Sequence, residues 1–360
     1  MKEKQSQRKL RPYRKRIEQL DAQIVALISE RATQVVKIGK IKGQLGEEVL
    51  DPVREKEVYH RIGQLNKGPL SDETLRAVYR EIMSGSLALQ KTIKVAYLGP
   101  EATFTHQAAL AKFGHSVEYI PAISINDVFY EVETRRADYG VVPIENSTDG
   151  AVNRTLDMFI DSDVRICSEI LFEISHCLLA RGRKDQIKRI YSKGEVFGQC
   201  NLWLRANLPR AEYIETSSTS RAAVMAREKP GSAAIASEIA ADLYELRVVA
   251  RSIQDITRNV TRFLVVGRGE SPKSGDDKTS VMFYTRDRVG ALHDILEVFK
   301  EGGISLSMIE SRPSGNKPFQ YYFFADFVGH VSNPKVAATL KKLKRKCGVL
   351  KVLGSYPKSP

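Results

Sequence analysis

The stretch YRKRIEQLDAQIVALISERATQVVKIGKIKGQL, residues 13–45, decides the fold of the first part of this 360-residue chain. It has no proline, and Gly39 is its only glycine before Gly43. Apolar residues recur in it at three- and four-residue spacing, which is the period of an amphipathic helix. These residues are Ile17, Leu20, Ile24, Leu27, Val35 and Ile38. A helix this long cannot bury its apolar stripe alone, so we expect a partner helix, supplied by a second chain.

Two further helices are predicted after this one. Asp51 and Pro52 have the form of an N-cap followed by proline at the first helical position. The polar residues 66–69 end that second helix. Residues 71–73, Ser-Asp-Glu, start a third helix with acidic side chains in its first turn. We therefore expect residues 10–92 to form an all-helical unit of three helices.

From Ile93 the hydrophobic pattern changes, and short apolar strands alternate with helices as far as Gly267. Alternation of this kind favours an α/β domain with a mostly parallel sheet. The length of this second unit, residues 93–267, allows two lobes with a cleft between them. The expected strands are 93–98, 117–120, 139–144, 187–191, 211–215, 233–236 and 263–266.

A third unit follows at the C-terminus. Residues 268–278 are rich in Gly, Ser, Pro and charge, which indicates a flexible linker. Residues 279–356 then have the order βαββαβ, the ferredoxin-like split motif of an α+β domain. The expected strands are 279–284, 304–311, 319–327 and 349–353, with helices at 291–301 and 334–344.

Composition indicates a soluble globular protein. The hydrophobic fraction is 42%, which is ordinary for such proteins. No apolar run approaches the ~18 residues that a membrane span needs. The N-terminus is basic and polar with no apolar core after it, so it is not a secretory signal. We expect a cytoplasmic protein with no membrane partner.

The formal net charge is +13, with basic clusters at residues 2–16 and 341–346. A basic protein can bind nucleic acid or small anionic substrates. No zinc finger or aromatic-rich binding strand accompanies these clusters. We interpret most of them as solvated surface and expect no nucleic-acid partner.

The cysteines do not have the spacing of a metal site. Cys167, Cys177, Cys200 and Cys347 form no Cys-x-x-Cys pair, and the six His residues form no cluster. This pattern argues against structural zinc and against a disulfide framework, and favours buried free thiols. We expect no metal and no cofactor.

Several polar residues of the helical unit lie on or beside its apolar stripe. Arg31 and Lys42 are eleven residues apart, so they share a helix face. Ser86 and Gln90 are neighbours at i and i+4 on the third helix. The second helix opens with Asp51, Arg54 and Glu55. Each residue alone also fits a cap or a solvated surface charge.

Together with Arg14, these residues resemble the all-helical class of chorismate mutases in type and nearly in spacing. Members of that family are intertwined dimers whose long first helices pair. The resemblance implies that Arg31, Arg54 and Arg14 of the partner chain clamp the two carboxylates of chorismate. Lys42 and Gln90 would stabilise negative charge on the ether oxygen as its bond breaks. Glu55 and the region of Asp51 would hold the ring hydroxyl, and Ser86 is a further implied substrate contact.

In the α/β unit, polar residues gather at strand ends, at 99–105, 143–150 and 259–263. Ligands of open α/β sheets lie beyond the carboxyl ends of strands, and helix N-termini there bind anions. Each of these stretches alone is also consistent with ordinary caps and turns.

The Pro-Ile-Glu-Asn-Ser run at 143–147 and the Thr-Arg-Phe run at 261–263 resemble the signatures of prephenate dehydratases, over about residues 94–267. The family fold is two-lobed and periplasmic-binding-protein-like, with the active site between the lobes. The resemblance implies that Thr261 donates a hydrogen bond to the departing ring hydroxyl of prephenate, a role in which positioning matters more than acidity. The substrate-binding residues that we infer are Thr103, Asn146, Ser147 and Arg262.

Arg262 and Glu145 have structural alternatives, an ion pair and hydrogen bonding within the domain. Two places depart from the family pattern. Residues 193–196 replace a common His-Pro-Gln-Ala run before Gln199-Cys200, and Ala102 replaces the usual glycine.

In the C-terminal unit, Gly290, Ala291 and Leu292 open the first helix, and Glu310 and Ser311 begin a Glu-Ser-Arg-Pro run that ends the second strand. Both motifs resemble the ACT-type regulatory domain attached to prephenate dehydratases. The resemblance implies phenylalanine bound at a domain–domain interface beside these five residues. Ser305 stands where that family often has asparagine.

We thus predict an enzyme that converts chorismate to prephenate and prephenate to phenylpyruvate, with feedback inhibition by phenylalanine. It would act as a homodimer or higher homo-oligomer. One alternative is a non-catalytic amino-acid sensor, but Lys42, Gln90 and Thr261 would not be needed by a sensor. A nucleic-acid-binding protein is the other alternative, and it rests on charge alone.

Overall fold

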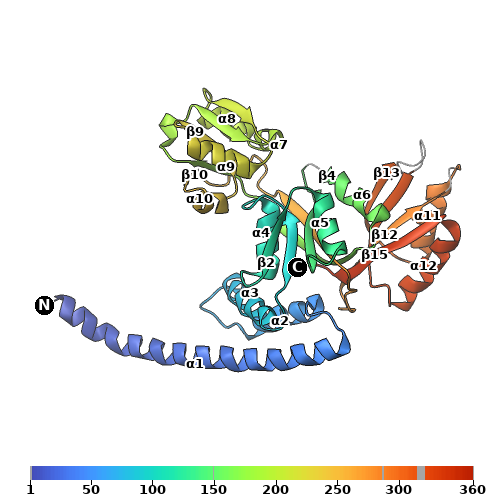
Figure 1. The fold of residues 1–360 in the computed structure, drawn as a ribbon, viewed down its shortest axis with the longest axis horizontal. Coiled ribbons are helices and arrows are strands. Elements are labelled where there is room, and N and C mark those ends of the chain that lie inside the picture. Colours follow the sequence, from blue (N-terminus) through green and yellow to red (C-terminus); the bar gives the residue numbers. More distant parts are fainter. Residues whose placement is uncertain (1, 149, 286–287, 314–320, 360) are drawn as a thin grey trace.

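The computed structural model describes residues 2–148, 150–285, 288–313 and 321–359, which Figure 1 shows as three packed units. A helical unit at the N-terminus is followed by a two-lobed central unit and a C-terminal α+β unit. The predicted fold class is confirmed.

The helical unit consists of α1 (Lys2–Leu45), α2 (Pro52–Leu65) and α3 (Asp72–Ala88). Asp51 caps α2 by accepting a hydrogen bond from the N–H of Arg54 at 2.9 Å. Ser71 caps α3 in the same way, with the N–H of Thr74 at 3.2 Å. Both predicted helix starts are therefore confirmed.

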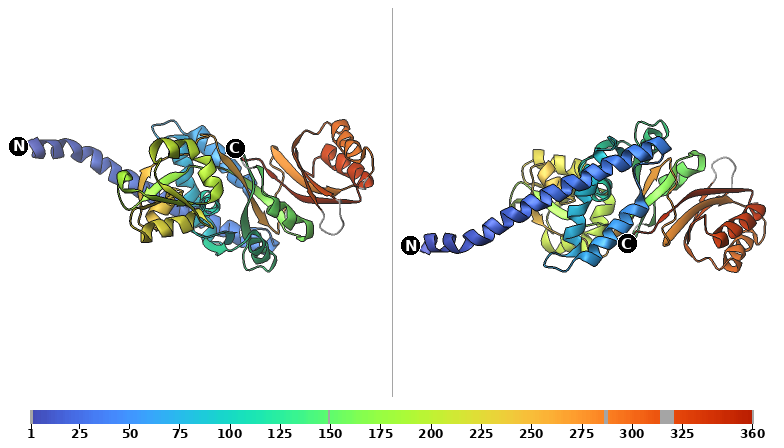
Figure 2. Two further views of the ribbon diagram at one scale, coloured as in Figure 1. Left: turned by 90° about the horizontal axis from the view of Figure 1, so that it is seen from above. Right: turned by 90° about the horizontal axis from the view of Figure 1, so that it is seen from below.

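The long helix α1 begins before the predicted Tyr13 and runs through Pro12. The residues on either side of Pro12 are mostly Lys, Arg and Gln, which favour helix. Their helix propensity offsets the loss of the one backbone hydrogen bond that proline cannot make. The apolar side chains of Ile17, Ile24 and Leu27 are 55%, 52% and 64% exposed. Figure 2 shows that the N-terminal part of α1 projects beyond the rest of the chain. The described part of the chain therefore leaves much of this apolar stripe uncovered.

The first lobe of the central unit is a sheet in the order β2-β1-β3-β11-β5, with β4 beside β3. Its strands are β1 (Lys94–Leu98), β2 (Glu118–Ala122), β3 (Tyr139–Asn146), β4 (Gly150–Ala151), β5 (Arg165–Glu173) and β11 (Val260–Gly267). Its helices are α4 (Phe104–Phe113), α5 (Ile125–Glu133) and α6 (Asn153–Asp161).

The second lobe is a five-stranded sheet in the order β10-β6-β9-β7-β8. Its strands are β6 (Cys177–Ala180), β7 (Arg189–Ser192), β8 (Glu212–Glu215), β9 (Ser232–Ala236) and β10 (Arg247–Ala250). Its helices are α7 (Gly194–Gln199), α8 (Asn201–Asn207), α9 (Thr219–Glu228) and α10 (Ile239–Leu243), with a 3₁₀ turn at Lys184–Gln186.

The expectation of a mostly parallel sheet is wrong, because both sheets are mixed. The chain crosses from lobe to lobe twice, and β11 returns to the first lobe antiparallel to both β3 and β5. In the second lobe, β6 runs antiparallel to β9 and β10. Strands β5, β6 and β10 were not predicted. Their partners are distant in sequence, so local pattern alone does not reveal them.

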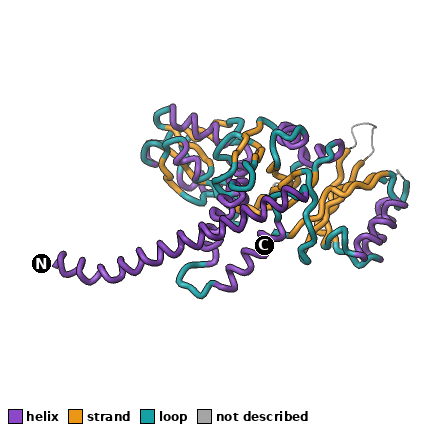
Figure 3. The backbone as a smooth tube through the Cα atoms, turned by 60° about the horizontal axis from the view of Figure 1, so that its bottom comes forward, coloured by secondary structure: helices purple, strands orange, loops and turns teal. Residues whose placement is uncertain are grey.

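The C-terminal unit has the predicted βαββαβ order, and its sheet is antiparallel in the order β13-β14-β12-β15. Its elements are β12 (Asp277–Tyr284), α11 (Ala291–Glu301), β13 (Leu306–Pro313), β14 (Tyr321–Val328), α12 (Pro334–Lys346) and β15 (Val349–Pro357). The first two residues of the predicted strand 319–327 lie outside the described residues. Both helices cover one face of the sheet (Figure 3).

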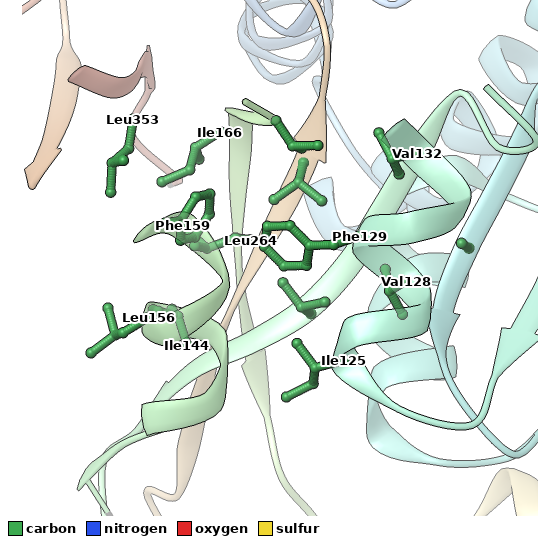
Figure 4. Packing of buried hydrophobic residues seen from close by; sticks show 14 of the residues in the cluster. Ile125, Val128, Phe129, Val132, Ile144, Leu156, Phe159, Ile166, Leu264 and Leu353 are labelled. Atoms are coloured by element: carbon green, nitrogen blue, oxygen red, sulfur yellow. The ribbon is translucent and has the colours of Figure 1, made fainter. Parts of the chain in front are cut away.

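The other face of this sheet packs on the first lobe. In Figure 4, Phe129 of α5 and Phe159 of α6 meet edge to face at the centre of a buried cluster, with ring centroids 5.1 Å apart. Leu353 of β15 belongs to the same cluster, as do Met282 and Phe324 of the C-terminal unit. One apolar core therefore spans two units.

The connection between these units, predicted as a flexible linker, is hydrogen-bonded in place. Arg268 donates to the carbonyl of Val132 at 2.7 Å, and Ser271 donates to that of Cys167 at 2.6 Å. Its glycine and serine residues form turns that are anchored on both sides, so its composition gave a misleading signal of mobility.

A buried charge cluster joins the central and C-terminal units. The guanidinium of Arg262 on β11 lies 2.8 Å from Glu169 of β5 and 2.6 Å from Asp326 of β14. It also donates to the hydroxyl of Tyr356 at 2.9 Å, and Lys278 lies 2.8 Å from Glu169. Burial alone would raise the pKa of Glu169, but Arg262 and Lys278 outweigh it and hold this pKa below its ordinary value of 4.5.

The depressed pKa predicts how stability depends on Glu169. Its contribution is fully present above the ordinary carboxyl pKa and is lost as pH falls through the lower pKa of the folded state. We expect Glu169→Gln to reduce the free energy of unfolding by about 3 kcal/mol near neutral pH, because two buried cations lose a shared carboxylate. Urea denaturation followed at several pH values measures this difference.

The gap between wild type and variant should begin to shrink as pH falls below 4.5, and it should close below the lower pKa of Glu169 in the folded state, where the wild type is protonated too. Glu173→Gln, on the exposed end of the same strand, is the matched control and should cost little. An unchanged stability of Glu169→Gln at neutral pH would contradict the role of this cluster.

Candidate active sites

The helical unit contains a cavity of about 530 Å³. It is bounded by α1, by the loop before α2, and by α2 and α3. Every predicted site residue of this unit except Arg14 lines it, namely Arg31, Lys42, Asp51, Arg54, Glu55, Ser86 and Gln90. The helices thus bring together residues that are widely separated in sequence.

Hydrogen bonds hold two of the lining cations in place. Arg31 donates to the hydroxyl of Ser86 at 3.0 Å, and this hydroxyl donates to the carbonyl of Ile82. Lys42 donates to the carbonyl of Glu48 at 3.2 Å and lies 3.9 Å from the carboxylate of Asp51. Both cations are therefore oriented before any substrate arrives.

Gln90 packs against Gly39 of α1. A Cβ at position 39 would lie 2.6 Å from Cγ of Gln90, so a side chain there would displace the glutamine. The side-chain oxygen of Gln90 is buried and has no hydrogen-bond partner among the described residues. A buried polar atom without a partner is unusual in a folded protein, so this oxygen is a candidate contact for a ligand.

Arg14 does not line this cavity. It lies on the exposed part of α1, about 25 Å along the helix axis from Arg31. Arg54 points to the rim, where it pairs with Glu57 at 2.7 Å. Within one chain, the cavity therefore has the two arginines expected from that chain, Arg31 and Arg54, and the contribution of Arg14 from a second chain stays a prediction.

The lining residues that were not predicted include Tyr59, Arg80, Lys112 and Phe113. Lys112 and Phe113 belong to α4 of the central unit, and the ammonium of Lys112 lies 2.6 Å from the carboxylate of Glu55. Burial, and next the charge of Glu55, raise the pKa of Tyr59 well above its ordinary value. No signal in the helical unit itself points to α4.

A second set of polar residues meets where β3 and β11 pair. Antiparallel pairing places Thr261 opposite Asn146, which joins the end of one predicted motif to the start of the other. The side-chain amide of Asn146 donates to the Thr261 hydroxyl at 2.6 Å and to the Asn259 side chain at 2.8 Å. Because the Thr261 oxygen accepts this bond, its own proton remains available to a ligand.

The second lobe completes this network. The Asn259 amide donates to the side-chain oxygen of Gln199, at the end of α7, at 3.3 Å. The same oxygen lies 2.8 Å from the ring nitrogen of His176, whose ring meets Phe104 edge to face. The polar set therefore lies between the two lobes.

In the C-terminal unit, Gly290 caps α11 with a φ of 76°, in the left-handed region that favours glycine. Ala291 behind it is buried, and Leu292 follows in the first turn. Glu310 and Ser311 lie on β13, the edge strand of the sheet. An edge strand presents backbone groups that a further surface could pair with.

The chain matches three known families. They are chorismate mutase type II over residues 13–91, prephenate dehydratase over residues 95–271 and the ACT domain over residues 279–345. The bifunctional chorismate mutase/prephenate dehydratase of Aquifex aeolicus is 48% identical over 355 residues, which is 97% of this chain and 98% of that protein. The protein of the same description from Pseudomonas aeruginosa is 45% identical over 360 residues, 98% and 99% of the two chains.

The chain belongs to the bifunctional chorismate mutase/prephenate dehydratase family. Among solved structures, the prephenate dehydratase of Arthrobacter aurescens in complex with L-Phe is similar, with a TM-score of 0.69 and 37% identity. That likeness covers 74% of this chain and 90% of the other. The three units are accordingly a chorismate mutase domain, a prephenate dehydratase domain and an ACT domain. The chain is an enzyme with both activities, not the amino-acid sensor kept as an alternative.

One predicted residue of the dehydratase domain has to be reassigned. Arg262 is adjacent to Thr261 on β11, so its side chain points to the opposite face of the sheet. There its guanidinium is buried against the ACT domain and paired with Glu169 and Asp326. The alternative interpretation, a structural ion pair, describes this geometry, and the interpretation as a substrate contact does not.

Thr103 and Ser147 also have structural partners. Thr103 caps α4 by accepting from the N–H of His106 at 3.3 Å. The Ser147 hydroxyl accepts from the N–H of Val260 at 3.0 Å, which locks β3 to β11. Their roles as substrate contacts stay predictions. Ala102, in place of the usual glycine, has a φ of 61°, which explains why glycine suits this position.

Sequence reasoning missed Asn259, Gln199 and His176 as site residues. Asn259 belongs to the polar stretch 259–263 identified from the sequence. Gln199 belongs to the Gln199-Cys200 pair that follows residues 193–196, where the family pattern is lost. That run, residues 193–196, forms the cap and first turn of α7, which carries Gln199. His176 stands alone in sequence and gave no signal.

The cysteines, possible metal ligands and long helices were also the subject of predictions. Cys167, Cys177 and Cys200 are buried free thiols as predicted, and burial raises the pKa of Cys200 to about 12. Among the described residues, no cluster of His, Cys, Asp and Glu could hold a metal ion. No described helix is long and apolar enough to cross a membrane.

The Asn146–Thr261 contact predicts how Thr261 can be replaced. Thr261→Val keeps the shape of the side chain but removes the hydroxyl, so we expect phenylpyruvate formation from prephenate to fall by about 100-fold or more. Thr261→Ser keeps the donor and should retain most of the rate. Steady-state kinetics on prephenate measure both, and the mutase rate should stay unchanged. Equal activity of the Val and Ser variants would show that the hydroxyl is not a donor.

Proposed function

We propose that the mutase reaction occurs in the cavity of the helical domain and the dehydratase reaction at the lobe junction of the same chain. Chorismate would enter the mutase cavity and leave as prephenate, which the second site would convert to phenylpyruvate. The observation that carries the proposal is the single cavity lined by polar residues from three helices, in the types and order of the chorismate mutase pattern.

In the mutase cavity, the roles follow from charge and position. Arg31 and Arg54 would bind the carboxylates of chorismate and favour the chair from which the ether bond breaks. Lys42 and Gln90 would donate to the ether oxygen, where negative charge develops. The rearrangement breaks one C–O bond and makes one C–C bond without proton transfer, so positioned donors suffice.

At the lobe junction, Thr261 would hold the ring hydroxyl of prephenate. Decarboxylation supplies the electron pair that makes the ring aromatic and expels this hydroxyl, which leaves as water after gaining a proton. A threonine is too weak an acid to protonate it outright, so its hydrogen bond stabilises the leaving group. Asn146 orients the threonine oxygen at 2.6 Å.

We propose that the protein is a cytoplasmic homodimer. The exposed apolar stripe of α1 supports pairing of two long helices, and Arg14 would then reach the cavity of the other chain. Four unpaired cysteines fit a reducing compartment.

Shared cavities predict complementation between two inactive variants. Lys42→Ala and Arg14→Ala should each lower the mutase rate, the first by about 100-fold or more, and leave the dehydratase rate nearly unchanged. In a heterodimer of the two variants, one cavity keeps both Lys42 and Arg14. Mutase activity on chorismate should therefore return when the two chains are co-expressed.

Lys40→Ala, an exposed position on the same helix, is the control and should stay active. Wild-type protein given chorismate should form phenylpyruvate, whereas Lys42→Ala should do so only from prephenate. Heterodimers that form but remain inactive would rule out a cavity completed by Arg14 of the second chain.

We further propose that phenylalanine binds the ACT domain and inhibits the dehydratase. The left-handed Gly290 cap and the edge strand β13 support this site, and the known L-Phe complex of a similar dehydratase agrees with the ligand. A ligand regulates only by binding one conformation better than another. Its coupling to prephenate binding is expected to be about 5–150-fold and reciprocal.

Gly290→Ala should weaken phenylalanine binding and relieve inhibition, because alanine disfavours a φ of 76° at the cap. Gly303→Ala, also at positive φ but beyond the other end of α11, is the matched control. Calorimetric titration of phenylalanine, with and without prephenate, measures the coupling. Equal inhibition of wild type and Gly290→Ala would indicate competition at the active site instead.

A further inference from the structure

The mutase cavity has a wall that the mutase domain does not supply. Lys112 and Phe113, in the last turn of α4, line it from the dehydratase domain. The ammonium of Lys112 lies 2.6 Å from Oε2 of Glu55, and the two side chains are only 14% and 17% exposed. This ion pair is much better shielded than the surface pairs that contribute little.

The position of Lys112 is fixed by the packing of α3 against the end of α4. Gly114 follows α4 at a φ of 71°, and a Cβ there would lie 2.5 Å from the side chain of Ser84. The Ser84 hydroxyl accepts from the N–H of Ser116 at 3.0 Å, and Glu81 accepts from the N–H of His115 at 3.0 Å. Lys112 therefore enters the cavity from a docked element.

The charge balance of the cavity gives this lysine a role. Glu55 is expected to accept a hydrogen bond from the ring hydroxyl of chorismate, yet a half-buried carboxylate facing a dianionic substrate is unfavourable. Lys112 compensates its charge and bonds one oxygen, Oε2. This leaves the other oxygen, Oε1, without a bond to Lys112 on a side chain that lines the cavity. The other charged lining residues are Arg31, Lys42, Asp51, Arg54 and Arg80.

We propose that Lys112 is a positioning residue of the chorismate mutase site, through which the dehydratase domain completes the cavity by orienting Glu55. The inference rests on the proposed location of the mutase reaction. The ring hydroxyl keeps its own bond to carbon throughout the rearrangement, so we expect its contact with Glu55 to be made both in the bound substrate and in the transition state. Loss of this contact should therefore appear mainly in KM.

The test is Lys112→Met in the full chain, which keeps an unbranched side chain without its charge. We expect the KM for chorismate to rise about tenfold, with a smaller fall in kcat, and the dehydratase rate to stay normal. Lys112→Arg keeps the ion pair and should restore most of the loss. A merely structural role would lower the active fraction, and so kcat, at unchanged KM.

Lys91→Met is the matched control. Lys91 forms another ion pair between the two domains, 2.5 Å from Asp138, but does not line the cavity, so its mutase constants should stay those of wild type. If Lys91→Met raised KM as Lys112→Met does, general loosening of the interface would explain both, and the proposal would fall.

A double-mutant cycle shows whether Lys112 acts through Glu55. In a Glu55→Gln background, Lys112→Met should have little further effect on KM. Additive effects would overturn the positioning role, because the lysine would then act on the substrate directly. Wild-type chain that does not rearrange chorismate would refute the proposed function itself. Normal wild-type activity with a normal KM in Lys112→Met would refute this inference alone.

Discussion

The buried guanidinium of Arg262 is the interaction on which the arrangement of the central and ACT domains depends. Its neighbours Glu169, Asp326 and Tyr356 come from three strands of two sheets. Burial disfavours its charge, but these neighbours outweigh that effect and raise its pKa above the ordinary value. A charge buried this way is strongly destabilising if one partner is lost, so the two sheets are held in one relative position. The shared core around Phe129 and Leu353 is apolar and less directional, and it fills the space that the charge cluster defines.

The same strand connects the ACT domain to the lobe junction. On β11, Thr261 faces the lobe junction, and the next residue, Arg262, faces the ACT sheet. Asp326 on β14 is thus linked, through the guanidinium and one peptide unit, to the residue of β11 that faces the lobe junction. Coupling between sites needs an element whose arrangement both sites bias, and β11 contacts both the lobe junction and the ACT sheet. The hydrogen-bonded connection at 268–276 adds a second tie between the domains.

Local features of this protein were predictable, and contacts between distant segments were not. The caps Asp51 and Ser71, the βαββαβ order and the cavity-lining residues follow from periodicity, capping chemistry and recognisable motifs. Strand β5 was missed because Ser168 and Glu169 interrupt its apolar pattern; both are buried, and Glu169 is compensated by cations from other strands. Arg262 fitted two interpretations, since nothing local tells a substrate contact from an ion pair. Lys112 gave no signal because its partner, Glu55, lies in another domain, and domain docking is not encoded in local pattern.

The three sites differ in how much of each a single chain supplies. The lobe junction brings Thr261, Asn146 and Gln199 together within one chain. The mutase cavity is lined by residues of three helices and by Lys112, all from one chain. In the proposed dimer, Arg14 of the second chain would complete it. The site proposed in the ACT domain includes residues of β13, an edge strand of its sheet. Helix α4 links the lobe junction and the mutase cavity, because Phe104 at its start meets His176 and Lys112 at its end meets Glu55, about 12 Å apart along the axis. The mutase and dehydratase domains are therefore docked against each other, since one short helix contacts both the mutase cavity and the lobe junction.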